Sequence, residues 1–290
     1  MKYKLLGGLA VQTTIYNILI HHAAVAHYNP NLVLLLGSTT RSVICFVIVF
    51  VNGYKTVDFD WKQMFFPSVL SFIKHQATFL GMVYLEPSLY QMLYQINIIF
   101  AALLTPRTLT NRQLLSIIVL FLGILTVLYH RDEVVKLPHH EPLEGMVFTV
   151  TAAAASAMHS QLIEDVLKSE EETTWVRQLQ MSLFGLGFSI LSCAFDYDNI
   201  TKTEKISNFV LVLVFIVCVG DMTLPFALKY ADNVTKSFSD TVATVVSLCL
   251  SQLLYHWHPR FGFYIGAVMI FFSAYLFTVS MSPPKVPIQT

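Results

Sequence analysis

The stretch LLSIIVLFLGILTVLYH, residues Leu114–His130, contains no Asp, Glu, Lys or Arg. A helix needs roughly 17–25 mainly apolar residues to cross the hydrocarbon core of a bilayer, and this stretch reaches that length. Similar stretches recur along almost the entire chain, in which 55% of the residues are hydrophobic and 12% are charged. Soluble domains carry about 25% charged residues. The sequence therefore predicts an integral membrane protein surrounded by the lipid bilayer.

Apolar stretches separated by short polar breaks predict ten membrane-spanning helices. The predicted spans are Leu5–Ala26, Leu32–Asn52, Phe65–Leu85, Pro87–Thr105, Leu114–His130, Gly145–Leu167, Trp175–Phe195, Phe209–Leu228, Val234–His256 and Phe261–Met281. The third and fourth spans are almost continuous, and the sequence LEPS at Leu85–Ser88 predicts the break between them, because proline disfavours helix in the residue before it. No soluble domain fits between the spans. We therefore expect an all-α fold in a single transmembrane domain, residues 1–290.

A polar segment near the midpoint divides the spans into two blocks of five. The first block covers residues 1–130, the central loop residues 131–144, and the second block residues 145–290. Because each block crosses the membrane an odd number of times, the second must be inserted upside down relative to the first. The span count therefore predicts an inverted repeat, which many transporters use to build a central site that is reached from either side.

The positions of lysine and arginine predict the orientation of the chain, since basic residues gather in cytoplasmic loops. The terminal and even-numbered loops hold ten basic residues and the odd-numbered loops hold five, while Arg41, Lys74 and Arg177 lie inside spans and complete the total of 18. We therefore expect both termini in the cytosol. The first span follows MKYK and is expected to be an uncleaved anchor. The glycosylation sequon at Asn199 then falls in a lumenal loop.

The fourth predicted span carries an unusually polar sequence, YQMLYQIN. In an unbroken helix, Tyr90, Tyr94 and Asn97 fall within one narrow arc, and Gln91 and Gln95 form a stripe beside it. One explanation is hydrogen bonding between helices, which membrane bundles use routinely. Five large polar groups on neighbouring stripes exceed what packing requires, so a water-filled cavity is favoured. The two tyrosines can stack on a base or ribose in such a cavity.

Three ordered segments carry a resemblance to a known family. The sequence YQMLYQIN is followed by LTNRQLLSIIVLFLGILTV, and later come IEDVLKSEEETTWVRQLQMSLFG (Ile163–Gly185) and LKYADNVTKSF (Leu228–Phe238). Together they resemble the nucleotide-sugar transporters of the Golgi, in the drug/metabolite transporter superfamily. The resemblance implies a multi-pass Golgi membrane protein of ten helices that exchanges a cytosolic nucleotide sugar, with a UDP-sugar favoured, for a lumenal nucleoside monophosphate. It implies a transporter rather than an enzyme, with no cofactor and no nucleic acid.

The third segment also makes chemical sense without the resemblance. It brings Lys229, Asp232, Asn233, Lys236 and Asp240 onto one face at the expected start of the ninth span, and Tyr230 lies in the same segment. Free N–H groups at a helix N-terminus and neighbouring lysines favour phosphate binding. Asp232 and Asp240 can hold Lys236 by pairing across one helical turn while no ligand is bound. The alternative is a charge-balanced cap at the membrane surface.

The chain departs from the family pattern at several expected ligand contacts. Asn97 stands where the resemblance implies a lysine, and His75-Gln76 where it implies paired asparagines. The departures in the second block are His159 and Ser160 in a segment of small residues, Asp221 after Gly220, and Ser237 after Lys236. Lys74 can supply the positive charge that Asn97 lacks, while Asp221 and His159 can read a different sugar.

Two alternatives to these substitutions as a ligand site stay open. Asp221 can be paired with Lys74, Arg41 or Arg177 as a structural ion pair, because charged groups inside a membrane seek partners. The cavity can also have lost its ligand. The protein would then be a transport-inactive relative that binds or regulates other membrane proteins, including homo- or hetero-oligomers with related transporters.

The candidate substrate-binding residues follow from these arguments. They are Lys74, His75, Gln76, Tyr90, Gln91, Tyr94, Gln95, Asn97, His159, Ser160, Asp221, Lys229, Tyr230, Asn233 and Lys236. We expect no metal site, because His139-His140-Glu141 in the central loop lacks a partner cluster of fixed spacing. The cysteines all fall inside predicted spans and are expected to be small buried residues.

Overall fold

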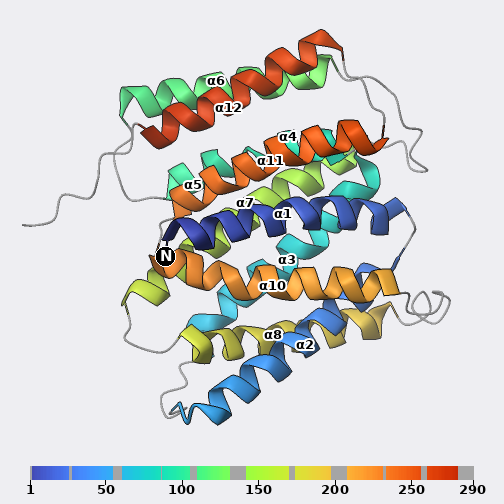
Figure 1. Cartoon of the computed structure of the whole chain (residues 1–290), viewed down its shortest axis with the longest axis vertical. Coiled ribbons are helices and arrows are strands. Elements are labelled where there is room, and N and C mark those ends of the chain that lie inside the picture. The colour runs from blue at the N-terminus through green and yellow to red at the C-terminus, as the bar shows by residue number, and fades with distance from the viewer. Residues whose placement is uncertain are drawn as a thin grey trace, which may run out of the picture.

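The computed structural model describes residues 2–25, 28–54, 61–85, 87–104, 110–130, 142–169, 174–196, 208–230, 233–255 and 260–279. These residues form eleven α-helices and no β-strand, which confirms the predicted all-α fold (Figure 1). The helices are α1 (Lys2–Val25), α2 (Pro30–Val51), α3 (Trp61–Tyr84), α4 (Pro87–Tyr94), α5 (Asn97–Leu104), α6 (Asn111–Tyr129), α7 (Pro142–Ser169), α8 (Thr174–Phe195), α10 (Asn208–Tyr230), α11 (Asn233–Tyr255) and α12 (Phe261–Val279). Most of the central loop, the sequon at Asn199, and Asp232 lie outside the described residues.

Local sequence signals set the starts of several helices. Thr110 caps α6 by accepting a hydrogen bond from the Gln113 amide, and the Gln113 side chain accepts one from the Thr110 amide in return. Asn29 caps α2, in which Pro30 is the first residue. The predicted break between the third and fourth spans is confirmed, since α4 begins at Pro87.

The fourth predicted span consists of two short helices instead of one. Helices α4 and α5 are separated by the turn residues Gln95 and Ile96. Amide groups here donate three residues back instead of four, as from Ile96 to Leu93 at 3.0 Å, so the winding tightens. The prediction of one unbroken helix is therefore wrong, and Asn97 begins a different helix from the one that carries Tyr90.

Five helical segments are long and apolar enough to cross a membrane, by length and composition alone. They lie in α2, α6, α7, α8 and α10, and shorter apolar helices cover Leu89–Leu104 and Phe261–Phe277. Helices α1, α3 and α11 are of similar length but lie outside this set, and each contributes polar side chains to a cavity inside the molecule. The count of ten crossings stays a prediction.

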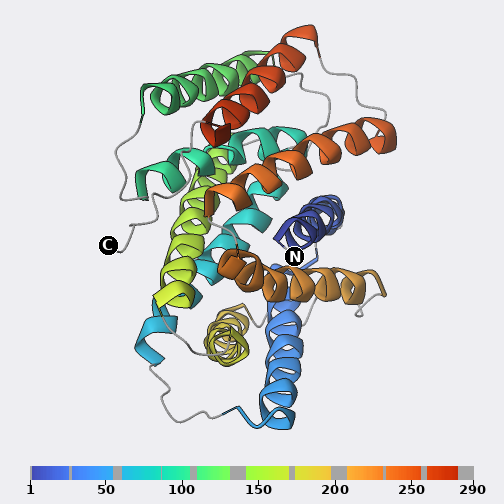
Figure 2. The ribbon, with the colours of Figure 1, turned by 60° about the vertical axis from the view of Figure 1, so that its left-hand side comes forward.

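The helices pack in a consistent order along the long axis of the molecule. Helices α6 and α12 lie side by side at one end, and α2 and α8 pack together at the other (Figure 1). Between them, α1 packs against α10 and α11, while α3 packs against α7 (Figure 2). Small residues allow the close approach of α6 and α12, because a Cβ atom added to Gly266 would lie 2.8 Å from the carbonyl oxygen of Gly123.

The outer surface is apolar to a degree that suits lipid. Phe50, Phe215 and Val268 are among many large hydrophobic side chains that are more than half exposed. Exposed Thr39 and Thr40 bond their hydroxyls to carbonyls one turn back, which satisfies them without water. Polar side chains instead gather inside, and the predicted burial of cysteines is confirmed for Cys45 and Cys218.

Candidate functional site

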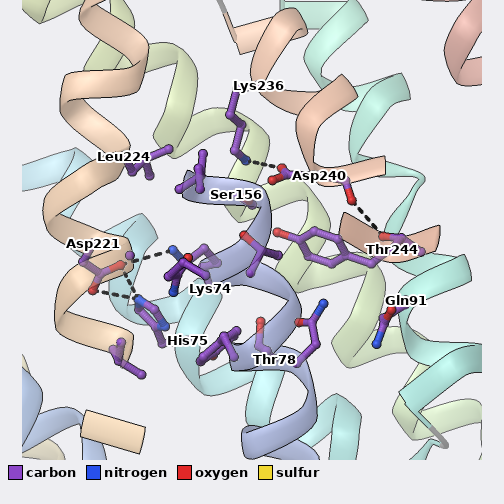
Figure 3. Close-up of a pocket in the computed structure, with 18 of the residues that line it drawn as sticks. Lys74, His75, Thr78, Gln91, Ser156, Asp221, Leu224, Lys236, Asp240 and Thr244 are labelled. Carbon is purple, nitrogen blue, oxygen red and sulfur yellow. Dashed lines mark hydrogen bonds and ion pairs between the residues drawn. The ribbon is translucent and has the colours of Figure 1, made fainter. Parts of the chain in front are cut away.

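A cavity of about 120 Å³ lies among α1, α3, α4, α7, α10 and α11 (Figure 3). The predicted binding residues that line it are Lys74, His75, Tyr90, Gln91, Tyr94, Asp221 and Lys236. These residues come from both predicted blocks of the chain. The structure thus brings together side chains that lie more than a hundred positions apart in the sequence.

Two stacked tyrosines form the aromatic side of the cavity. The rings of Tyr90 and Tyr94 have centroids 5.7 Å apart and planes inclined by 24°. The Tyr90 hydroxyl donates to Thr78 Oγ1 at 3.0 Å, which fixes the ring. Gly81 makes room for it, because a Cβ atom there would lie 2.8 Å from Tyr90 Cε2. The cavity therefore has an oriented aromatic face on which a flat ring can stack.

Gln91 supplies an unused donor and acceptor beside these rings. Its side chain is buried, and neither its amide nitrogen nor its amide oxygen has a hydrogen-bond partner among the described residues. Buried amides usually have partners, because an unsatisfied polar group costs about 1–3 kcal/mol. An amide that lines a cavity with both atoms free is suited to a ligand that offers the complementary pair.

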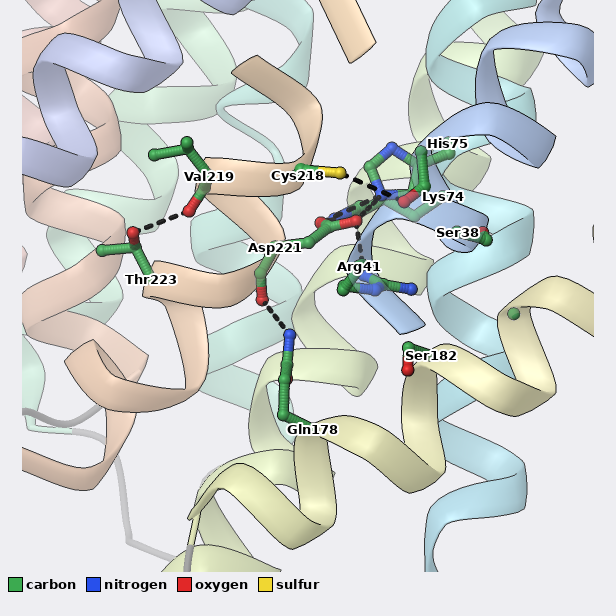
Figure 4. A network of polar contacts seen from close by, with 12 residues as sticks. Ser38, Arg41, Lys74, His75, Gln178, Ser182, Cys218, Val219, Asp221 and Thr223 are labelled. Carbon is green, nitrogen blue, oxygen red and sulfur yellow. Dashed lines mark hydrogen bonds and ion pairs between the residues drawn. The ribbon is translucent and has the colours of Figure 1, made fainter. Parts of the chain in front are cut away.

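Asp221 gathers positive groups on the opposite side of the cavity. Its carboxylate lies 2.7 Å from the Arg41 guanidinium on α2 and 3.8 Å from the Lys74 ammonium on α3 (Figure 4). His75 Nε2 lies 3.1 and 3.2 Å from the two carboxylate oxygens. Since a carboxylate only accepts, His75 donates from this nitrogen. The ion pairs expected for Asp221 are confirmed for Arg41 and Lys74, whereas Arg177 donates to Gln180.

A proline explains how the Asp221 backbone is held. Pro225 lies one turn later inside α10 and has no N–H, so the carbonyl of Asp221 lacks its usual helical donor. The side-chain amide of Gln178 on α8 donates to this carbonyl at 2.8 Å (Figure 4). Gln178 is itself buried, so α8 supports the segment of α10 that carries the carboxylate.

Lys236 forms the second ion pair of the cavity. Its ammonium lies 2.8 Å from Asp240 one turn later in α11, which confirms the predicted pairing. The N-terminus of α11 already meets an anion, since the amide of Asn233 donates to Glu164 of α7 at 2.7 Å. Glu164 also accepts from Lys168 at 2.6 Å. The phosphate expected at this N-terminus would therefore meet a resident carboxylate.

Three predicted binding residues make hydrogen bonds to other helices. Gln95 donates to Thr244 at 2.8 Å and accepts from Thr241 at 3.1 Å, both on α11. Gln76 donates to Asn31 of α2. The contact of His159 is a hydrogen bond of 2.8 Å from Nδ1 to the carbonyl of Pro67, which joins α7 to α3. For these residues the structure gives interhelical partners.

The remaining predicted residues lie at the ends of helices or in the core. Asn97 and Ser160 are buried, and Asn97 Oδ1 and Ser160 Oγ lack partners in the described part of the chain. Asn233 is also buried at the start of α11. Lys229 and Tyr230 are exposed at the C-terminal end of α10. Burial therefore separates Lys236 from Lys229, which the sequence had treated as equivalent.

Helix α1 contributes cavity residues that the sequence reasoning did not select. Gln12, Thr13, Tyr16 and Asn17 all line the cavity from this helix. A signal existed, because QTTIYN interrupts the otherwise apolar first span. Gln12 also donates to the carbonyl of Ile216 on α10 at 3.0 Å, which links α1 to the helix of Asp221.

Comparison with known proteins gives matches along almost the entire chain. Residues 1–278 match the profile of the family described as "Nucleotide-sugar transporter". The UDP-galactose/UDP-N-acetylglucosamine transporter srf-3 of Caenorhabditis elegans is 25% identical, with 97% of this chain and 83% of the relative covered. The human UDP-N-acetylglucosamine transporter is 20% identical over 99% of this chain and 98% of its own length. The UDP-galactose transporter of Schizosaccharomyces pombe is 24% identical, over 98% of this chain and 90% of the relative.

A solved crystal structure shares the fold. It superposes with a TM-score of 0.66 at 16% sequence identity, with 95% of this chain and 96% of the other covered. At this identity the likeness concerns the arrangement of helices, not the ligand.

Proposed function

Because the chain belongs to the nucleotide-sugar transporter family, we propose that it exchanges a cytosolic UDP-sugar for a lumenal nucleoside monophosphate across the Golgi membrane. The names of the three relatives, all of which are UDP-sugar transporters, support the choice of uridine. The observation that carries the proposal is one cavity with stacked tyrosines on one side and two lysines, Lys74 and Lys236, facing the same space.

The chemistry of a UDP-sugar suits the groups around this cavity. The uracil ring can stack on Tyr90 or Tyr94, and its imide edge offers the donor and acceptor that the free amide of Gln91 complements. The phosphates require positive charge, because an unmatched charge is costly in a poorly hydrated site. Lys74 and Lys236 are the lysines that line this cavity in the described residues.

The proposed mechanism is alternating access between two inverted five-helix blocks. The pattern of helix packing supports the repeat, because the contacts come in pairs that an exchange of the two blocks interconverts. Thus α1 packs on α10 as α7 packs on α3, and α4 packs on α6 as α11 packs on α12. The cavity is smaller than the roughly 300–1,000 Å³ of typical ligand sites, so the blocks would have to separate to admit a nucleotide sugar.

A second candidate function is supported by the charge balance of the cavity. Both lysines are paired with carboxylates, Lys74 with Asp221 and Lys236 with Asp240. Asn97 stands where the family resemblance implies a further cation. A cavity in which the resident charges neutralise one another also suits a transport-inactive relative that binds or regulates other membrane proteins.

Exchange in reconstituted vesicles separates the two functions. Proteoliposomes that contain uridine monophosphate should take up labelled UDP-N-acetylglucosamine or UDP-galactose faster than vesicles that contain uridine, which lacks the phosphate. Protein-free vesicles measure leakage, and a thermal melt of the reconstituted sample shows that the protein is folded. If folded protein gives no such stimulation with any UDP-sugar, the exchanger proposal is wrong and the regulatory function takes its place.

A further inference from the structure

The contacts around Asp221 are unequal. The carboxylate lies within hydrogen-bond distance of Arg41 at 2.7 Å and of His75 at 3.1 and 3.2 Å. Lys74 lies 3.8 Å away, which is too far for a hydrogen bond, so it contributes attraction without a directed bond. Asp221 is therefore held mainly by Arg41 and His75, and Lys74 is its most weakly attached partner.

The two cations also face different spaces. Lys74 lines the cavity with the stacked tyrosines, whereas Arg41 lines a second, smaller cavity between α2, α3, α8 and α10, together with Ser38. Asp221 and His75 line both cavities and so lie between them. A ligand in the larger cavity would therefore meet Lys74, while Arg41 supports the carboxylate from behind (Figure 4).

We propose that Lys74 is a transferable cation, which Asp221 holds while the cavity is empty and which moves to a phosphate oxygen when a nucleotide binds. Arg41 stays on Asp221 throughout and keeps the carboxylate neutralised, so the transfer does not leave a buried charge without a partner. The inference rests on the proposed function, because it assigns a phosphate contact within the same site. Asp221 is then a competitor of the ligand and has no role in reading the sugar.

The second lysine of the cavity does not have this freedom. Lys236 is bonded to Asp240 at 2.8 Å, and Asp240 has one cation partner among the residues that the structure covers. Removal of Lys236 to a ligand would leave a mostly buried carboxylate without its counter-ion, which is strongly unfavourable. Lys236 can still donate to a phosphate while it keeps Asp240, because an ammonium has three donors. The resident carboxylate thus competes with the ligand for Lys74 far more than for Lys236.

Removal of the competing charge should strengthen the binding of an anionic ligand. Purified full-length Asp221→Asn should bind uridine monophosphate about tenfold more tightly than the wild type, since one freed charge-assisted contact is of that order. Binding of uridine, which has no phosphate, should be unchanged. The gain should disappear in Lys74→Met/Asp221→Asn, which shows that it acts through Lys74. Dissociation constants from isothermal titration of the detergent-solubilised protein measure all of these effects.

Two further variants control for charge and folding. Asp165→Asn removes the same charge from the exposed face of α7 and should leave binding unchanged. Arg41→Gln/Asp221→Asn removes both members of the buried pair, so it tests the same freed Lys74 if Asp221→Asn alone does not fold. Unchanged or weaker binding of uridine monophosphate in both Asp221 variants, with a wild type that binds it, overturns the inference alone. If no variant binds the nucleotide, the proposed function and the inference are both wrong.

Discussion

The two lysines of the third sequence segment should behave differently when each is replaced by glutamine. Lys236 is 7% exposed and lines the cavity, whereas Lys229 is exposed at the end of α10. A hydrogen bond to a charged group contributes about 1.5–3 kcal/mol. Lys236→Gln should therefore raise the dissociation constant for uridine monophosphate by roughly 12- to 140-fold, at 1.4 kcal/mol for each factor of ten. Lys229→Gln should change it by less than about twofold, as expected for a solvated lysine.

The loss of Lys236 also affects folding, and this effect must be separated from binding. Asp240 would keep its charge while it loses a partner at 2.8 Å, and breaking a buried pair in this way costs up to about 3–5 kcal/mol. Lys236→Gln/Asp240→Asn removes both charges and should recover the melting temperature without recovering nucleotide affinity. Isothermal titration and a thermal melt on the same preparations measure both quantities. If Lys236→Gln binds as the wild type does, or if Lys229→Gln is equally impaired, the assignment of the phosphate side is refuted.

Three other outcomes are expected from the structure. Gly81→Ala should lower the melting temperature and weaken nucleotide binding, because the new Cβ would press on the Tyr90 ring at 2.8 Å, whereas Gly187→Ala in the open interior of α8 should be neutral or stabilising; equal melts for the two variants would contradict this. Gln178→Met should cost about 1–3 kcal/mol by leaving a buried carbonyl unpaired, and Pro225→Ala should restore part of this stability through the new N–H, so a double variant that is no more stable than Gln178→Met argues against the reasoning. Tags at both termini should be digested by protease added to sealed Golgi vesicles, as the charge bias predicts, and protection of either tag would reverse the proposed orientation.

Some elements of the site could be predicted because they depend on residues close together in the chain. The Lys236–Asp240 pair is one turn apart on a helix, so spacing alone predicts it. Tyr90 and Tyr94 are also one turn apart, and their stacking follows from the same geometry. The break in the middle of the fourth span was missed, because YQIN contains neither proline nor glycine to mark it.

Other elements depend on contacts that sequence spacing does not encode. Three cations were possible partners for Asp221, and the packing of α2 and α3 beside α10 selected Arg41 and Lys74, which lie 180 and 147 positions away. In the same way, packing gave Gln76 a partner on α2 and gave His159 one on α3. A polar residue in a span must find a partner, but its composition does not say whether that partner is a helix or a ligand.

The sequence by itself determined that this protein is helical and embedded in a membrane, because the transfer of a segment into lipid depends on its own composition and length, and backbone groups in lipid must be satisfied within the segment. Only the tertiary structure decided which polar groups share one cavity, which are consumed by interhelical bonds, and that Lys74 lies between a carboxylate and the space for a ligand. The physical reason is range. Insertion and helix formation are local, whereas the partner of a buried charge is whichever group packing brings within about 4 Å.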